Sequence, residues 1–136
     1  MAERALTLPQ LADLVGVEYR TLHTWLGRGL LAPSRARSRG SGSRNLFDGE
    51  DALEAFVLAD LRRAGVELPT LERVSRALRA ARPQRGDGGV LLVNGSVSFC
   101  TDEVCLREAL AHSSPTLVYD VAHAQAALSG RLATPE

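Results

Sequence analysis

Residues 7–31 decide the fold of the first half of this chain and read TLPQLADLVGVEYRTLHTWLGRGLL. Thr7 followed three residues later by Gln10 is a capping box, which predicts that a helix begins here. Its apolar stripe repeats at helical spacing and consists of Leu8, Leu11, Leu14 and Val15. Gly16 follows this stripe directly and predicts the end of the helix.

A second short helix is expected from about residue 18, with an apolar face formed by Leu22, Trp25 and Leu26. Gly29 offers a left-handed stop after it. Because Trp25 lies on the apolar stripe, we expect its indole in the core rather than on a stacking platform. Two short helices joined by a tight glycine turn form a helix-turn-helix.

The composition changes after this motif. Residues 32–47 read APSRARSRGSGSRNLF and lack any periodicity, which predicts a loop or hairpin, the wing of a winged fold. Asp48 can cap a third helix that ends at Gly65. Pro69 suits the start of a fourth helix that continues to about Ala81.

A change in pattern also separates the two halves of the chain. Residues 82–89 read RPQRGDGG and combine proline, glycine and charge as a linker does. Strands, a helix from about residue 102 to 112 and a last helix in AHAQAALSGRL follow this segment, and one sheet face has these two helices to cover it. The sequence therefore predicts a mainly α N-terminal winged helix-turn-helix domain (1–82), a linker (83–89) and a small α+β domain of β-β-α-β-α order (90–136).

Asn94-Gly95 lies between two short apolar runs and predicts a two-residue hairpin turn. That register pairs Leu92 with Val97 and Val90 with Phe99 on one sheet face. It leaves Leu91 and Val93 on the other face, where they can pack on the first domain or on another subunit. These two alternatives are about equally favoured, and the second makes Leu91 and Val93 a candidate interface.

The charge of the chain is distributed unevenly. Net charge is zero, which alone argues against a general nucleic-acid binder. Residues 1–85, however, hold fourteen arginines against ten acids, whereas residues 86–136 hold two against six. No acid lies between Glu18 and Asp48, although that window holds Arg20, Arg28, Arg35, Arg37, Arg39 and Arg44. Such a stretch suits a polyanion.

The second helix carries the candidate DNA contacts. With its apolar face turned inward, Arg20, His23 and Thr24 project outward and Tyr19 lies at the edge. A solvated helix face is the usual interpretation of such residues, but the neighbouring arginine-rich segment favours a DNA surface. We expect Arg20, His23 and Thr24 to read bases and Tyr19 to reach backbone oxygens. Backbone or minor-groove contact is expected for Arg28, Arg35, Arg37, Arg39 and Arg44.

These residues resemble the N-terminal domain of MerR-family transcription regulators over roughly 75 residues. The resemblance is carried by Arg20-Thr21-Leu22, Gly29-Leu30-Leu31 with Pro33 and Arg35, Phe47 with Asp51, and Leu61-Arg62 before Gly65. It implies a homodimer that binds double-stranded DNA at a pseudo-palindromic promoter and distorts it for RNA polymerase.

The chain departs from the family pattern at several positions. His23 stands where the family commonly has arginine, Trp25 replaces its usual tyrosine, and Asn45 occupies the place of its wing arginine. The long dimerisation helix typical of the family is also missing.

The sequence was also searched for reactive cysteines, for catalytic, metal-binding and phosphate-binding motifs, and for membrane spans. Cys100 and Cys105 are expected to be reduced in the cytoplasm, and burial as apolar residues is favoured over a thiol sensor. We find no nucleophile-base arrangement, phosphate loop or metal motif, so we expect no enzyme activity and neither cofactor nor metal. No apolar run is long enough to span a membrane, which predicts a cytoplasmic location.

Two other functions remain open. The chain could be an antitoxin-like autorepressor whose C-terminal domain binds a protein partner. It could also be an architectural DNA-binding factor of a mobile element, which bends DNA without activating transcription.

Overall fold

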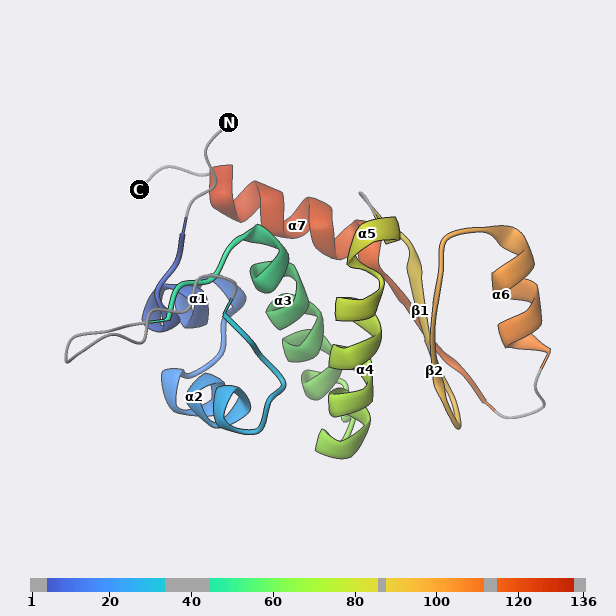
Figure 1. Ribbon diagram of the computed structural model, residues 1–136, viewed down its shortest axis with the longest axis horizontal. Coiled ribbons are helices and arrows are strands. Elements are labelled where there is room, and N and C mark those ends of the chain that lie inside the picture. The colour runs from blue at the N-terminus through green and yellow to red at the C-terminus, as the bar shows by residue number, and fades with distance from the viewer. Residues whose placement is uncertain (1–4, 34–44, 86–87, 112–114, 134–136) are drawn as a thin grey trace.

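A computed structural model of the chain describes residues 5–33, 45–85, 88–111 and 115–133 (Figure 1). In the described residues, four helices form the N-terminal half, a short fifth helix follows them, and a three-stranded sheet with two further helices forms the C-terminal half. Most of the predicted wing lies outside the described residues, including Arg35, Arg37, Arg39 and Arg44.

The first two helices, α1 (Leu8–Val15) and α2 (Tyr19–Gly27), form the predicted helix-turn-helix. The capping box is present, because Thr7 N–H donates to Gln10 Oε1 at 2.9 Å and Gln10 N–H donates to Thr7 Oγ1 at 3.4 Å. Gly16 has a φ of 77°, a conformation that glycine adopts without steric cost, and it turns the chain from α1 into α2.

Helix α3 (Gly49–Arg63) is the centre of the fold, with every residue from Asp51 to Ala59 buried. Asp48 and Asp51 form a second capping box at its start. Helix α4 (Leu68–Ala80) packs against it. Before α3, Leu6 and Phe47 exchange two backbone hydrogen bonds of 2.8 Å, which fix the chain on the C-terminal side of the 34–44 segment.

The segment after α4 contains a short helix, α5 (Arg82–Arg85), that is tied to α3 by ion pairs. Arg82 contacts Glu54 at 2.6 Å and Asp51 at 2.8 Å, and Arg85 contacts Glu54 at 3.0 Å. The hydrogen bonds to Glu54 raise the pKa of the Arg82 guanidinium above its ordinary value. Residues 82–85 are therefore fixed against the N-terminal helices.

The C-terminal half has the predicted β-β-α-β-α order, with β1 (Val90–Val93), β2 (Val97–Cys100), α6 (Glu103–Leu110), β3 (Leu117–Asp120) and α7 (Val121–Ala133). The strands form an antiparallel sheet in the order β2-β1-β3. Gly89, just before β1, has a φ of 117°, and a Cβ there would clash with the Phe99 ring. A side chain at this position would force the Phe99 ring to move.

The predicted hairpin register is wrong by one residue. Val93 pairs with Val97 and Leu91 with Phe99, so three residues rather than two form the loop. The cause is the Asn94 side chain, whose Oδ1 accepts the Ser96 N–H at 3.1 Å while Asn94 N–H donates to Ser96 O at 2.9 Å. This local turn competes with the two-residue turn that Asn-Gly favours.

The sheet packs on the N-terminal helices through the face that bears Leu91. Leu91 is fully buried in a hydrophobic cluster shared with α1, α2, α3 and α4, and Val93 packs against this cluster. Of the two alternatives for Leu91 and Val93, the structure shows packing on the N-terminal helices. The interface with another subunit that was expected at these two residues is therefore wrong for this structure. The division of the chain at residues 83–89 stays a prediction.

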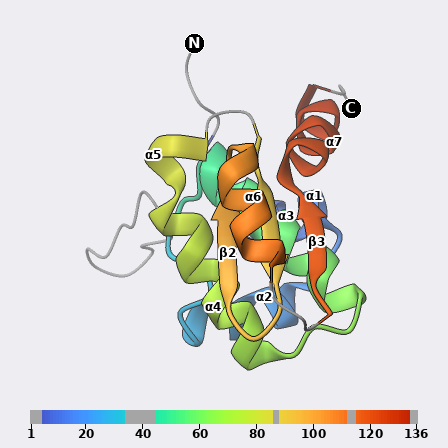
Figure 2. The same cartoon turned by 90° about the vertical axis from the view of Figure 1, so that its right-hand side faces the viewer.

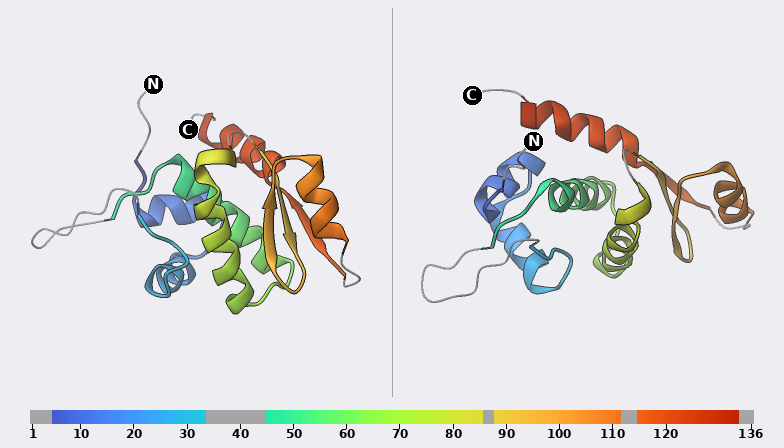
Figure 3. Two further views of the ribbon diagram at one scale, coloured as in Figure 1. Left: turned by 45° about the vertical axis from the view of Figure 1, so that its right-hand side comes forward. Right: turned by 45° about the horizontal axis from the view of Figure 1, so that its top comes forward.

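The two C-terminal helices lie in different places. Helix α6 covers the sheet face opposite α3, next to β2 (Figure 2). Helix α7 leaves the sheet and packs along α3 and α1 (Figure 3). The expectation that both helices cover one sheet face is therefore wrong, because helices already provided by the N-terminal half cover the Leu91 face.

Cys100 at the end of β2 and Cys105 in α6 form a disulfide with a Cα–Cα distance of 5.5 Å. The expectation of two reduced thiols is therefore wrong for this structure. The N-cap Asp102, whose Oδ1 accepts the Cys105 N–H at 2.8 Å, brings the two cysteines together by turning the chain into α6. Across the described ranges, no helix is long and apolar enough to cross a membrane.

Candidate nucleic-acid interface

Helix α2 is buried on one face and open on the other. Leu22 is fully buried and Trp25 is 3% exposed, which confirms the predicted core position of the indole. On the opposite face Arg20, His23 and Thr24 are all exposed, and Tyr19 is 51% exposed. The apolar residues thus anchor the helix and leave a continuous polar row available to a ligand.

A hydrogen bond within α2 determines which donors and acceptors the exposed polar row presents to a ligand. The Thr24 hydroxyl donates to the Arg20 carbonyl at 3.1 Å, so its proton is used within the helix. Thr24 is therefore free to act as a hydrogen-bond acceptor and can receive a donor such as an amino group on a base edge. Arg20 supplies donors only, so the two side chains have complementary roles.

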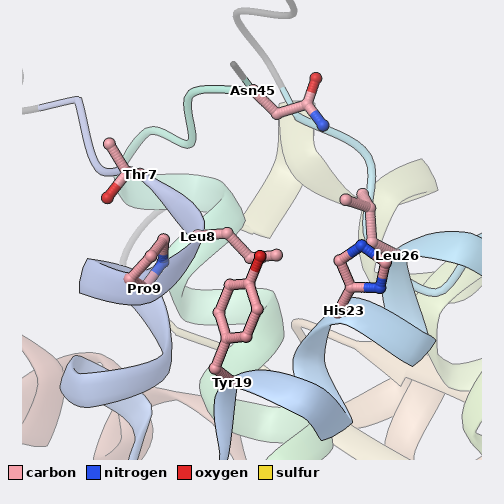
Figure 4. Close-up of a pocket in the computed structure, with 7 residues that line it drawn as sticks. All are labelled: Thr7, Leu8, Pro9, Tyr19, His23, Leu26 and Asn45. Atoms are coloured by element: carbon pink, nitrogen blue, oxygen red, sulfur yellow. The ribbon is translucent and has the colours of Figure 1, made fainter. Parts of the chain in front are cut away.

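The edge of α2 next to α1 borders a hollow of about 370 Å³ (Figure 4). Its apolar wall consists of Leu8, Pro9 and Leu26. Its polar groups come from separate elements: Thr7 precedes α1, Tyr19 and His23 lie on α2, and Asn45 precedes α3. The rings of Tyr19 and His23 lie side by side with centroids 5.9 Å apart.

Asn45 is a residue that the sequence singled out only as a departure from the family pattern. The structure places it on the same hollow as Tyr19 and His23, because the Leu6–Phe47 bridge holds the chain before α3 beside the start of α1. Its carboxamide can both donate and accept hydrogen bonds. Asn45 therefore joins the candidate interface.

Arg28 has an ion-pair partner within the protein. Its Nη2 lies 3.1 Å from Glu72 Oε2 of α4, and both side chains are partly exposed, at 46% and 33%. Such an exposed ion pair contributes only about 0–1 kcal/mol, so Arg28 can exchange Glu72 for a phosphate at small cost. Arg35, Arg37, Arg39 and Arg44 cannot be placed, since they lie outside the described residues.

Contacts from distant parts of the chain hold the helix-turn-helix in place. Ser75 Oγ of α4 donates to the Leu30 carbonyl after α2 at 2.7 Å. Arg131 Nη1 of α7 donates to the Leu14 carbonyl of α1 at 2.6 Å, and its guanidinium stacks 5.0 Å from the centre of the Phe56 ring. No local sequence signal marks these side chains, because their partners are 45 and 117 residues away.

Metal chemistry finds no support in the described ranges, which contain no group of three or more histidine, cysteine or acidic side chains suited to an ion. The disulfide leaves Cys100 and Cys105 without free thiols, so neither can act as a thiolate ligand in this state. The described candidate interface is therefore made of arginine, imidazole, phenol, hydroxyl and amide groups.

Comparison with known proteins agrees with this geometry. A family model described as MerR HTH family regulatory protein matches residues 6–78, which span all four N-terminal helices except the last two residues of α4. A search of curated proteins finds no significant match to the chain.

Proposed function

The chain belongs to the family of MerR HTH regulatory proteins and is a DNA-binding transcriptional regulator, and we propose that α2 is its recognition helix in the major groove. Arg20 and Thr24 read base edges. Tyr19, His23 and Asn45 contact the sugar-phosphate backbone at the edge of the groove. The arginine-rich segment 34–44 acts as the wing and contacts the backbone or the minor groove.

The exposed row on α2 is the observation that carries this proposal. A helix that binds in the major groove needs polar groups on one face and a rigid support behind the other. Leu22 and Trp25 supply that support, and the Ser75 and Arg131 hydrogen bonds fix the backbone after α2 and at the end of α1, respectively. Arg20 faces outward and has the five-donor fork that binds guanine in a bidentate manner.

The experiment is a titration of a duplex selected by the full-length chain from a random-sequence pool. We expect Arg20→Ala to weaken binding of that duplex by roughly 1–3 kcal/mol without loss of helix content. Arg107→Ala is the matched control, because it removes the same charge from α6 at the far end of the molecule (Figure 1). Equal affinities for the Arg20→Ala and Arg107→Ala proteins would refute the assignment.

Arg28→Ala tests the backbone role separately. Since Arg28 would contact phosphate rather than a base, its loss should weaken all duplexes about equally and reduce the slope of log affinity against log salt by about 1. A change in sequence preference with an unchanged salt slope would contradict this role.

We also propose that the protein binds as a homodimer, the arrangement that a pseudo-palindromic site requires. In the structure α7 packs on α3 and α1 of its own chain, so it does not extend as a free helix toward a second copy. Sedimentation of the full-length chain with and without the selected duplex tests the dimer. A single copy bound to a two-fold symmetric duplex would contradict it.

Contact with RNA polymerase, an antitoxin-like role and an architectural role stay predictions. Val104, Leu110 and Val118 in the C-terminal half have exposed apolar side chains, which favours the antitoxin-like role with a protein partner. Co-purification with the product of a neighbouring gene tests the antitoxin-like role. DNA bending without a promoter response would favour the architectural role.

A further inference from the structure

We propose that DNA binding by this chain takes up a proton at His23, so that its affinity for DNA falls as the pH rises through the neutral range. The inference rests on the proposed function, because it requires a duplex against the exposed face of α2. It adds a regulatory property to that surface, namely sensitivity to pH.

The position of His23 is the first reason. Its imidazole is exposed on α2 and borders the hollow, next to the Tyr19 ring (Figure 4). Tyr19, His23 and Asn45 line the hollow beside the start of α1, whereas Arg20 and Thr24 do not. Groups at this edge of a recognition helix meet the sugar-phosphate strand beside the groove rather than the base pairs at its floor.

The charges around His23 are the second reason. Helix α1 contributes Thr7, Leu8 and Pro9 to the hollow, and Asn45 is the contribution of the segment before α3. None of these groups titrates near neutral pH. From α2 itself the neighbours are the phenol of Tyr19 and the guanidinium of Arg20 one turn earlier.

No described residue that lines the hollow is a carboxylate, so the described part of the protein offers an imidazolium there no counter-ion. A DNA phosphate would supply one. A phosphate oxygen binds the charged imidazolium more strongly than the neutral ring, since charge-assisted hydrogen bonds are about twice as strong as neutral ones. Proton uptake and DNA binding therefore favour each other.

The direction follows from linkage. A bound phosphate stabilises the protonated form of an imidazole beside it. The extra affinity is present while the imidazole is protonated and is lost as the pH rises to the point where the complex also gives up its proton. A shift of about one pH unit in that point corresponds to a change in affinity of about tenfold.

The test measures affinity for the selected duplex at several pH values from about 6 to about 8, at constant ionic strength because phosphate contacts depend on salt. For the unmodified full-length chain we expect about a tenfold fall across this range for each copy of the chain on the duplex. His23→Gln keeps a hydrogen-bond donor without a titratable group and should bind weakly at every pH. His23→Arg carries a permanent charge and should bind tightly at every pH.

His123→Gln is the matched control, because His123 is exposed on α7 and removed from the α2 surface. Its affinity should depend on pH as the unmodified chain does. A pH-independent affinity of the unmodified chain, or an unchanged pH dependence in His23→Gln, would overturn the inference and leave the proposed function standing. Absence of DNA binding at every pH would overturn both.

Discussion

Helix α3 and helix α6 represent two ways in which this chain holds a helix in place. Every residue of α3 from Asp51 to Ala59 is buried, whereas α6 has no fully buried residue. Helix α6 is attached by its Asp102 cap, a disulfide and contact with β2. The N-terminal half therefore draws its stability from a continuous core, and the outer layer of the C-terminal half depends on a few individual links.

The largest effect is expected where charge is buried in the N-terminal half. Glu54→Ala should destabilise the fold by about 3–5 kcal/mol, because it leaves the buried Arg85 and the partly buried Arg82 without their main partner. Denaturant unfolding measures this change. Glu103→Ala, which breaks the exposed Arg107 pair of α6, is the control and should have almost no effect. Equal losses of unfolding free energy in the Glu54→Ala and Glu103→Ala proteins would contradict the difference proposed between α3 and α6.

Leu91→Ala tests whether the sheet belongs to the continuous core. We expect a loss of about 2–5 kcal/mol, since Leu91 is fully buried in the cluster shared with the N-terminal helices. Leu110→Ala makes the same chemical change at a side chain of α6 that is 46% exposed, and it should cost much less. A single unfolding transition is also expected, and separate transitions for the two halves would argue against a shared core.

Cys105→Ser removes the covalent link of α6. For a loop this short, the chain-entropy relation gives a loss of about 2 kcal/mol. Because α6 buries so little, we expect hydrogen exchange in residues 103–110 to rise before exchange in α3 changes. An equal rise in α3 would show that the disulfide supports the whole fold.

The smallest effect is expected at the contact between β3 and α3. The Tyr119 hydroxyl donates to Asp60 at 2.6 Å, so Tyr119→Phe should cost about 1–2 kcal/mol. Burial, and then this hydrogen bond, raise the pKa of Tyr119. Because the folded pKa is the higher one, its contribution is complete below the ordinary tyrosine value of about 10 and is lost as the pH rises above it. In denaturant unfolding, the Tyr119→Phe protein should not show this loss of stability at alkaline pH. An alkaline loss equal to that of the unmodified chain would contradict the role given to Tyr119.

Sequence reasoning succeeded where the signal is local. The Thr7–Gln10 box, the Asp48 cap and Gly16 fix helix ends within a few residues, and the structure confirms all three. The polar row on α2 follows from the same helical spacing, because burying Leu22 and Trp25 leaves the opposite side chains exposed.

It failed where two local preferences compete or where partners are far apart in the chain. The Asn94 side chain formed its own turn and moved the hairpin register by one residue. The covering of the Leu91 face depended on helices from the other half, which no periodicity within residues 90–136 could reveal. Asn45 joined the candidate interface through the Leu6–Phe47 bridge, a contact between distant segments.

The contact of α7 with the first helices sets an order for biosynthesis. Residues 8–63 are synthesised before Arg131, so the Leu14 carbonyl and the Phe56 ring lack their contacts with Arg131 until α7 has been made. Ala124 and Leu128 of α7 can then join the core beside α3 only after the N-terminal helices have been made. A prematurely terminated chain would thus carry α1 and α2 on an unfinished scaffold, which makes it a substrate for proteases.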